Sequence, residues 1–260
     1  MSNNSLSFLG NTTSYISIPN NAGLNFEDQD FTVEWFQYQT DTNFFPRVFQ
    51  KGTLEEEPEG ASIGVSIEGG TFYYWRFDNP TAVVTLNASD YKNKWVHFAV
   101  CRASGVTRFY MNGTLIYTLA DTTNYTNTQP LMVANESALD NTNSSFGGYL
   151  YYFHFIKGLA KYTSNFTVTT AIVPAVGETV LLLTAAGASG TLANTITRTA
   201  GTFLIAPESP PFMPAPPQSA ALRGRFRLFT DNSRVYYKPH SLASGGIGGV
   251  RNARRKARRT

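Results

Sequence analysis

The stretch Arg108-Phe-Tyr-Met-Asn-Gly-Thr-Leu-Ile-Tyr117 decides the fold class. Two short runs rich in aromatic and aliphatic residues are joined there by Asn112-Gly113. Both of these residues accept the positive φ angles of a type I′ turn, which matches the twist of paired strands. The stretch therefore predicts a β-hairpin of two antiparallel strands.

Similar short runs, in which apolar and polar residues alternate, recur from residue 6 to residue 184 with polar or glycine-rich turns between them. No run of ten or more residues has a helical period, and the best short helix candidate is around Gly158–Tyr162. Strands without crossover helices pair antiparallel, so we predict an all-β fold, an antiparallel two-sheet jelly-roll sandwich. The expected strands are Leu6–Phe8, Tyr15–Ile18, Phe31–Trp35, Ile63–Ile67, Thr71–Phe77, Ala82–Leu86, Trp95–Arg102, Thr107–Met111, Thr114–Leu119, Leu131–Ala134, Tyr149–Phe155 and Val180–Thr184.

The distribution of charge divides the chain in two. Residues 1–218 contain 10 Lys or Arg and 17 Asp or Glu, whereas residues 219–260 contain 11 Lys or Arg and a single acid, Asp231. Six prolines lie between Pro207 and Pro217, and such a run favours an extended spacer. We therefore predict a jelly-roll domain at residues 1–206, a Pro-rich linker at 207–218 and an extended basic C-terminal arm at 219–260.

Five segments, in this order along the chain, resemble the laminin-G-like, concanavalin A-like lectin/glucanase superfamily. The resemblance spans residues 5–185 and implies a jelly-roll binding module. The five segments are Leu6–Pro19, Phe31-Thr-Val-Glu-Trp35, Trp95-Val-His-Phe-Ala-Val100, Arg108-Phe-Tyr-Met-Asn-Gly113 and Gly147–Ile156.

A narrower resemblance concerns three other stretches. Phe155–Thr167 followed by Val180–Leu183 is similar to laminin-G-like modules of large DNA viruses and some phages. The tail from Val235 to Thr260 is similar to the end of some virion proteins of large algal DNA viruses. This resemblance implies a minor capsid or virion-associated protein, made in the host cytoplasm and partnered by other capsid or virion proteins.

The titratable residues do not form a recognisable catalytic set. Glycosidases of the superfamily use paired carboxylates that converge on the glycosidic bond. Glu27-Asp-Gln-Asp30 with Glu34 lacks that spacing, and we expect a polar loop followed by one solvent-facing strand carboxylate. His97 and His154 fall among aromatic residues in strand patterns, which favours packing over a role as general base. Cys101 is the only cysteine, so an internal disulfide is excluded, and its apolar neighbours predict a buried thiol.

Lectin-like relatives often bind calcium, and oxygen-rich loops flank the strand expected at Leu131–Ala134. Calcium takes six to eight oxygen ligands from carboxylates and carbonyls. The candidate ligands are Asp121, Asn135 and Asp140. Since Asn and Asp are also the usual turn residues, an ordinary turn is the alternative at each position.

Carbohydrate binding has one candidate strand. Tyr73, Tyr74, Trp75 and Arg76 offer rings for stacking against a sugar and one cation. Because successive strand residues point to opposite faces of a sheet, we expect at least half of them to fill the core.

The basic arm is the strongest functional lead. Clustered cations neutralise the phosphates of nucleic acids, and the resulting affinity depends on salt but not on nucleotide sequence. The arm therefore predicts nucleic acid as one partner. An acidic protein surface in an assembly fits equally well, and a nuclear-localisation signal or a merely solubilising tail are further alternatives. The candidate binding residues are Arg223, Arg225, Arg227, Tyr236, Tyr237, Arg251, Arg254, Arg255, Lys256, Arg258 and Arg259.

These observations lead to one hypothesis and two alternatives. The hypothesis is a non-enzymatic structural or binding protein of the virion, in which the jelly roll contacts protein or glycan and the arm anchors it. The first alternative is a carbohydrate-binding lectin module for adhesion, and the second is an inactive or divergent glycosidase. No cofactor other than the possible calcium is expected. The longest apolar run, Thr179–Leu183, is far too short to insert across a membrane.

Overall fold

The computed structural model describes residues 5–40, 43–52, 60–76, 79–136, 142–169, 177–184, 187–189, 197–198 and 204–206. The chain divides into two units, residues 1–215 and 216–260, and every described residue belongs to the first. The predicted linker at 207–218 and basic arm at 219–260 lie outside the described residues.

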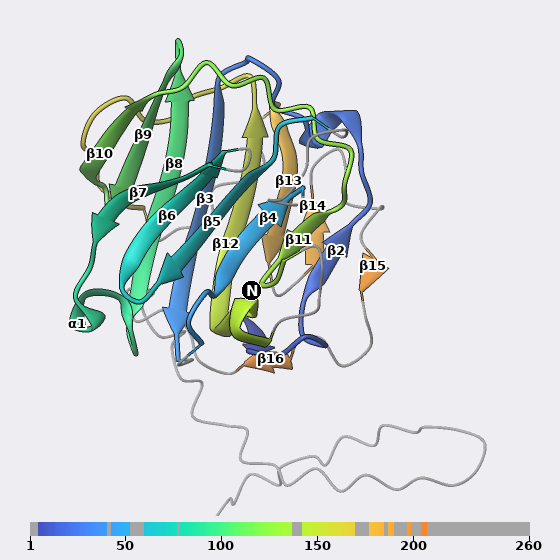
Figure 1. Ribbon diagram of the computed structural model, residues 1–260, viewed down its shortest axis with the longest axis vertical. Helices are drawn as coiled ribbons and strands as arrows, with labels where there is room; N and C mark the ends of the chain where they lie inside the picture. Colours follow the sequence, from blue (N-terminus) through green and yellow to red (C-terminus); the bar gives the residue numbers. More distant parts are fainter. Residues whose placement is uncertain are drawn as a thin grey trace, which may run out of the picture. The chain divides into compact units, whose positions relative to one another are not determined.

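Two antiparallel sheets face each other, as the all-β prediction requires (Figure 1). Sheet A has the strand order β10-β9-β8-β3-β12-β1-β16, and β13 pairs with both β12 and β14. Its strands are β1 (Ser5–Leu9), β3 (Phe31–Gln39), β8 (Trp95–Ala103), β9 (Val106–Met111), β10 (Thr114–Ala120), β12 (Gly147–Lys157), β13 (Thr179–Thr184), β14 (Gly187–Ser189) and β16 (Leu204–Ala206).

Sheet B has the strand order β15-β2-β11-β4-β5-β6-β7. Its strands are β2 (Ile16–Ile18), β4 (Arg47–Lys51), β5 (Ile63–Glu68), β6 (Thr71–Arg76), β7 (Asn79–Thr85), β11 (Leu131–Val133) and β15 (Thr197–Arg198). Three short helices, η1 (Ala22–Leu24), α1 (Ala88–Tyr91) and η2 (Thr142–Ser144), complete the elements of the described residues.

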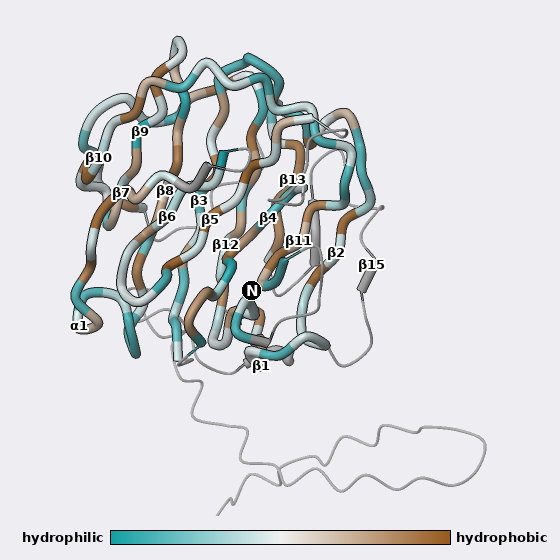
Figure 2. Tube along the Cα trace, viewed as in Figure 1, coloured by the Kyte–Doolittle hydropathy of each residue, from teal (hydrophilic) through white to brown (hydrophobic). Residues whose placement is uncertain are grey.

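An aromatic core fills the space between the sheets. Trp35 on β3 is fully buried and lies 5.9 Å from the ring of Phe49 on β4 and 5.7 Å from that of Phe98 on β8. Figure 2 shows hydrophobic residues recurring along the strands of both sheets, with mostly hydrophilic connections between them. Each fully buried side chain of this size contributes about 1.5–3 kcal/mol, so this alternation drives the two sheets together.

All twelve expected strands are present, but four further strands, β4, β14, β15 and β16, were not predicted. The first of these is the longest. A β-bulge between Arg47 and Phe49 interrupts its alternation, so that Val48 and Phe49 are both buried in the core. The expected helix around Gly158–Tyr162 is wrong: residues 158–168 form an irregular segment that we call the strap. Gly158, at its start, has a φ of +85°, which no helical residue adopts.

The predicted hairpin turn is confirmed and supports the strap. Asn112 and Gly113 have φ angles of +50° and +78°, and they join β9 to β10. The carbonyl of Gly113 accepts a hydrogen bond from the amide of Phe166, at 2.9 Å. A Cβ atom on Gly113 would lie only 2.1 Å from the carbonyl oxygen of Phe166.

Replacing Gly113 by alanine therefore tests the contact between turn and strap. Gly105→Ala is the matched control, because Gly105 also has a positive φ, +73°, but its Cβ would meet Thr122 Cγ2 at 3.4 Å. We expect the control to lose only the roughly 1–2 kcal/mol of a left-handed alanine. Gly113→Ala should lose about 1–3 kcal/mol more through overpacking, as measured by urea unfolding. Equal losses in the two variants would contradict the contact.

Candidate functional site

The four residues predicted to bind carbohydrate do not share one face. Tyr74 points into the core and is fully buried. Tyr73 and Trp75 lie on the outer face of sheet B, where both are partly exposed. Arg76, at the end of β6, turns toward the rim of the sandwich, where its Nη1 donates to the carbonyl of Ala120. The outer face and the rim are therefore two separate environments.

Tyr73 and Trp75 belong to a polar and aromatic surface that spans three strands. Their ring centroids are 6.2 Å apart, and the guanidinium of Arg47, on β4, stacks 4.4 Å from the centre of the Trp75 ring. The indole N–H of Trp75 donates to Ser66 Oγ, on β5, at 2.8 Å. We call this surface the Trp75 platform. It consists of five residues of β4, β5 and β6: Arg47, Ser66, Glu68, Tyr73 and Trp75.

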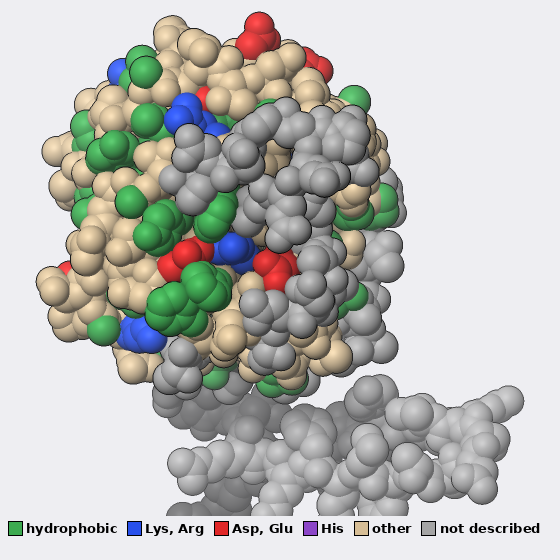
Figure 3. Space-filling model, in the orientation of Figure 1, with side chains coloured by type: hydrophobic (Ala, Val, Ile, Leu, Met, Phe, Trp, Pro, Cys, Tyr) green, Lys and Arg blue, Asp and Glu red, His purple; other side chains and the backbone are tan. Residues whose placement is uncertain are grey.

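An ion pair neutralises the platform. Arg47 forms a salt bridge with Glu68, and Ser66 Oγ donates to Glu68 Oε1 at 2.7 Å. The pairing register explains this grouping, because Arg47 lies opposite Ser66 and Ser66 lies opposite Tyr73 on the same face. Figure 3 shows basic and acidic side chains side by side with hydrophobic ones near the middle of this face. The platform thus combines flat rings with fixed donors and acceptors and carries no net charge.

Gly64 lets the strands beside Trp75 pack closely. It is buried and is paired with Gln50 on one side and Trp75 on the other. A Cβ at Gly64 would lie 3.1 Å from the carbonyl oxygen of Phe49, so a side chain there would crowd the backbone of β4.

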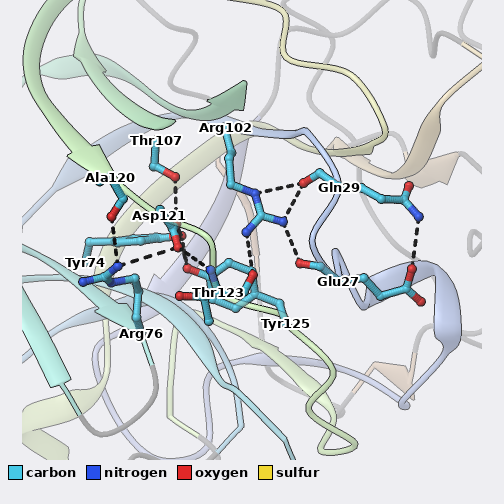
Figure 4. Close-up of polar contacts among 10 residues, drawn as sticks. All are labelled: Glu27, Gln29, Tyr74, Arg76, Arg102, Thr107, Ala120, Asp121, Thr123 and Tyr125. Atoms are coloured by element: carbon cyan, nitrogen blue, oxygen red, sulfur yellow. Dashed lines mark hydrogen bonds and ion pairs between the residues drawn. The ribbon is translucent and has the colours of Figure 1, made fainter. Parts of the chain in front are cut away.

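The rim of the sandwich holds a fully bonded carboxylate, Asp121 (Figure 4). The side chain is completely buried. Burial by itself raises the pKa of this carboxyl, but hydrogen bonds from Thr107, Thr123 and Tyr125 outweigh that effect and lower it. Its neighbours are Thr107 Oγ1 at 2.7 Å, Tyr125 Oη at 2.9 Å, the Thr123 amide at 3.2 Å, Tyr74 Oη at 3.3 Å and Arg76 Nη1 at 3.7 Å.

This environment does not suit calcium. Every neighbour of Asp121 is a hydrogen-bond donor or a cation, whereas Ca²⁺ needs converging oxygen acceptors. Asn135 is buried, and its Oδ1 accepts from the amide of Glu136 at 2.9 Å. Asp140 lies outside the described residues. Within the described part of the chain, no cluster of three or more His, Cys, Asp or Glu side chains fits a metal ion. The calcium prediction therefore gains no support.

Beside Asp121, Arg102 ties two loops together. It donates to the carbonyls of Gln29, Glu27 and Thr123, at 2.9, 2.6 and 2.7 Å respectively. Its guanidinium lies about 5 Å from the ring of Tyr125 as well. Three backbone acceptors and a ring occupy this cation, so its role at the rim is structural (Figure 4).

The expectation that Glu34 faces solvent is wrong. Glu34 lies on the outer face of β3, where it is only 1% exposed because the strap covers it. His154 Nδ1 lies 3.2 Å from Glu34 Oε1, and His97 Nε2 lies 3.6 Å from Oε2. From the strap, Lys161 forms an ion pair with Oε1 and Tyr162 Oη donates to Oε2 at 2.8 Å. Two neighbouring strands and a distant segment thus converge on one carboxylate.

A β-bulge in β12 brings His154 to this point. Tyr151 is paired with Phe36 and His154 with Glu34, so two residues of β12 lie opposite one residue of β3. Tyr152, within the bulge, has a φ of +54°. The additional residue keeps Phe153 in the core while His154 faces Glu34, as bulges commonly re-aim side chains.

These neighbours keep Glu34 ionised. Burial raises the pKa of the carboxyl, but hydrogen bonds from His154 and His97, together with the charge of Lys161, lower it well below its usual range. The charged form is therefore held in place by donors on both oxygens. Such a carboxylate anchors the strap, and it can neither donate a proton at neutral pH nor reach a substrate.

The strap also packs on apolar residues of sheet A. Tyr162 stacks on Phe166, with centroids 3.5 Å apart, and both lie over Ala99, Cys101 and Tyr110. The predicted buried thiol is confirmed, since Cys101 is fully buried and burial raises its pKa to about 12. The outer face of sheet A is therefore closed beneath the strap.

Several of these residues escaped the sequence analysis. Arg47 and Glu68 are on strands whose pairing the sequence does not specify, and β4 itself was not predicted. Glu34, His97 and His154 were noticed separately. A shared signal exists, because period-two alternation places all three on the side opposite the core, but only the strand order makes them neighbours.

Comparisons with known proteins agree on the fold. A family model described as the concanavalin A-like lectin/glucanases superfamily matches residues 9–158. A putative carbohydrate binding protein from Bacteroides ovatus is similar in structure, with a TM-score of 0.52 and 16% identity. The match covers 78% of this chain and 55% of the Bacteroides ovatus chain. No curated protein sequence is significantly similar to this chain.

Two further solved structures resemble it more distantly. Domains LG4-5 of the mouse laminin α1 chain give a TM-score of 0.46 with 14% identity, over 64% of this chain and 46% of the laminin chain. Domain 4 of an extracellular arabinanase from Geobacillus stearothermophilus gives a TM-score of 0.44 with 16% identity, over 58% of this chain and 70% of the arabinanase chain. This chain thus covers about half the length of the laminin and Bacteroides ovatus chains.

Glu34→Gln measures how strongly the carboxylate anchors the strap. The folded-state pKa of Glu34 lies below its ordinary 4.5, so its contribution to stability is present above pH 4.5 and is lost as the pH falls. At pH 7 we expect a loss of about 3 kcal/mol, because the change removes the buried partner of the partly exposed Lys161 and the acceptor of several hydrogen bonds. The difference from wild type should shrink as the pH falls below 4.5 in urea unfolding.

Glu178→Gln provides the matched control, since Glu178 is exposed. It should change stability by less than about 0.5 kcal/mol at any pH. If Glu34→Gln were as mild as this control at pH 7, the anchoring role would be refuted.

Proposed function

The chain belongs to the concanavalin A-like lectin/glucanases superfamily, and from this we propose that its jelly roll is a non-enzymatic carbohydrate-binding module. The Trp75 platform is the observation that carries this proposal. It is the place in the described sheets where partly exposed aromatic rings lie beside side chains whose donors and acceptors are fixed by an ion pair.

The chemistry of the platform suits a sugar. A sugar ring has a face of C–H groups, which packs on an aromatic ring, and an edge of hydroxyls, which needs donors and acceptors. Tyr73 and Trp75 supply the rings, and the partly exposed Glu68 supplies a carboxylate. The buried Arg47 and Ser66 hold that carboxylate and the Trp75 indole in place. Because Arg47 is already paired with Glu68, the platform favours a neutral glycan over an acidic one.

Three of the described carboxylates favour a non-enzymatic role. Glycoside hydrolysis requires two carboxyl groups that flank the scissile bond. Glu34 is sealed beneath the strap, Asp121 is fully hydrogen-bonded at the rim, and Glu68 is held by Arg47. In the same direction, the similar Bacteroides ovatus structure is described as a putative carbohydrate binding protein.

Removing the Trp75 ring tests the proposal on a glycan array. Trp75→Ala should weaken binding at least about tenfold, since a stacked ring contributes on the order of 1.4 kcal/mol. Tyr38→Ala is the control, because Tyr38 is a partly exposed aromatic residue on the outer face of sheet A. If neither variant changes binding, or if Tyr38→Ala has the larger effect, the platform is not the glycan site.

A second, separate proposal concerns residues 219–260. Their eleven Lys and Arg residues, against a single acid, favour an arm that anchors the module to nucleic acid or to acidic proteins of a virion. Full-length protein should be retained on purified virus particles at low salt and released as salt rises, whereas residues 1–206 alone should not be retained. Equal retention of the two at every salt concentration would reject the anchoring role.

A further inference from the structure

The side chain of Lys51 is buried although it carries a charge. Lys51 ends β4 and lies in the same row across sheet B as Leu131 of β11 and Ile18 of β2, which both belong to the core. Residues directly opposite each other on paired strands share a face, so the stem of Lys51 lies on the inner side of the sheet. The residue is only 1% exposed, whereas a lysine usually keeps its ammonium group in water. The protein must therefore replace that water with its own atoms.

Three oxygen atoms surround the ammonium group. Lys51 Nζ donates to Asn20 Oδ1 at 2.9 Å, to the carbonyl of Gln129 at 3.0 Å and to the carbonyl of Asn127. An ammonium group has three N–H donors, so each of them has an acceptor. The oxygens come from two loops, one that follows β2 and one that precedes β11. The ammonium group therefore joins both loops to the end of β4.

The loop before β11 is also held by contacts that do not involve Nζ. Asn127 Oδ1 accepts from the amide of Gln129 at 2.8 Å, and Asn127 Nδ2 donates to the carbonyl of Gly60 at 2.9 Å. A Cβ on Gly52, directly after Lys51, would lie only 2.6 Å from Asn127 Nδ2, so the packing here is close. The two carbonyls that bind Lys51 thus belong to a loop that is fixed in position.

The oxygens around Lys51 carry no net charge. All three belong to amide groups, one from a side chain and two from the backbone. Burial lowers the pKa of Lys51 to about 8, so the group is still mainly protonated at pH 7. Calcium takes six to eight oxygens, and carboxylates are usually among them. Three neutral oxygens suit a cation with a single charge better.

We propose that these oxygens form a site for a monovalent cation, and that the ammonium group of Lys51 is its resident cation. Lys51 then does for the loops beside β11 what a bound metal ion would do. A shorter residue at position 51 leaves the oxygens in place, and potassium or ammonium from solution takes the empty position. The site is separate from the Trp75 platform, because no platform residue supplies an oxygen to it.

A charge placed at Asn20 tests the site in a protein that still folds, because Asn20 is exposed. Asn20→Asp puts a carboxylate beside the ammonium group and should raise the melting temperature of the full-length protein by about 3 °C. Asn21→Asp is the matched control, since Asn21 is also exposed and its Oδ1 accepts from the amide of Gly23 instead. It should change the melting temperature by no more than about 1 °C. In a Lys51→Met background, Asn20→Asp should bring no gain.

Removing the resident cation tests whether an ion can replace it. Lys51→Ala should lower the melting temperature by on the order of 6 °C in choline chloride, whose cation is too large for the site. Potassium or ammonium chloride at the same concentration should restore at least half of that loss, and calcium chloride should restore less. Lys51→Met fills the space with an apolar chain, so its melting temperature should be the same in all four salts.

Three results would each overturn the proposal. The first is an equal effect of Asn20→Asp and Asn21→Asp on the melting temperature. The second is a Lys51→Ala protein that is equally stable, or equally unfolded, in choline and in potassium. The third is a larger rescue of Lys51→Ala by calcium than by potassium.

Discussion

The central strands of sheet A are buried on both faces, and much of the structure depends on this constraint. Nearly every residue of β3, β8 and β12 is buried, although a strand of a two-sheet sandwich needs only one face in the core. The second face is closed by the strap, and Glu34 is the residue that fastens it there. On the outer side of sheet B, by contrast, Tyr73 and Trp75 of β6 remain partly exposed.

Three buried charges of the described residues, Glu34, Asp121 and Arg102, follow one rule. An ionised group taken from water must be paired or hydrogen-bonded on all sides. Glu34 contacts a lysine, a tyrosine and two histidines. Asp121 accepts hydrogen bonds from hydroxyl groups and lies beside an arginine. Arg102 donates to three backbone carbonyls. Since these charges are committed to holding strap, rim and loops, they are not available for acid–base chemistry.

The sequence predicted the local structure well and the long-range contacts poorly. The hairpin at Asn112-Gly113 and the period-two strands follow from local backbone preferences, so they were predictable. The bulge in β4 hid that strand, because two consecutive core residues break the alternation. Alternation also shows that Glu34 points away from the core, but not that Lys161, 127 residues later, covers it. Likewise, Tyr73 and Trp75 were predictable as candidates, whereas Arg47 and Glu68 required the strand order.

The most direct test of the carbohydrate-binding account uses the three tryptophans as reporters. Trp35 and Trp95 are buried, whereas Trp75 is partly exposed on the platform. A glycan selected on an array is titrated into ¹⁵N-labelled protein, and the three indole N–H resonances are followed. The account predicts a saturable shift of the Trp75 indole with the amides of β5 and β6, and little change at Trp35 and Trp95. A silent Trp75 indole, with shifts in the strap or on the outer face of sheet A, would contradict it.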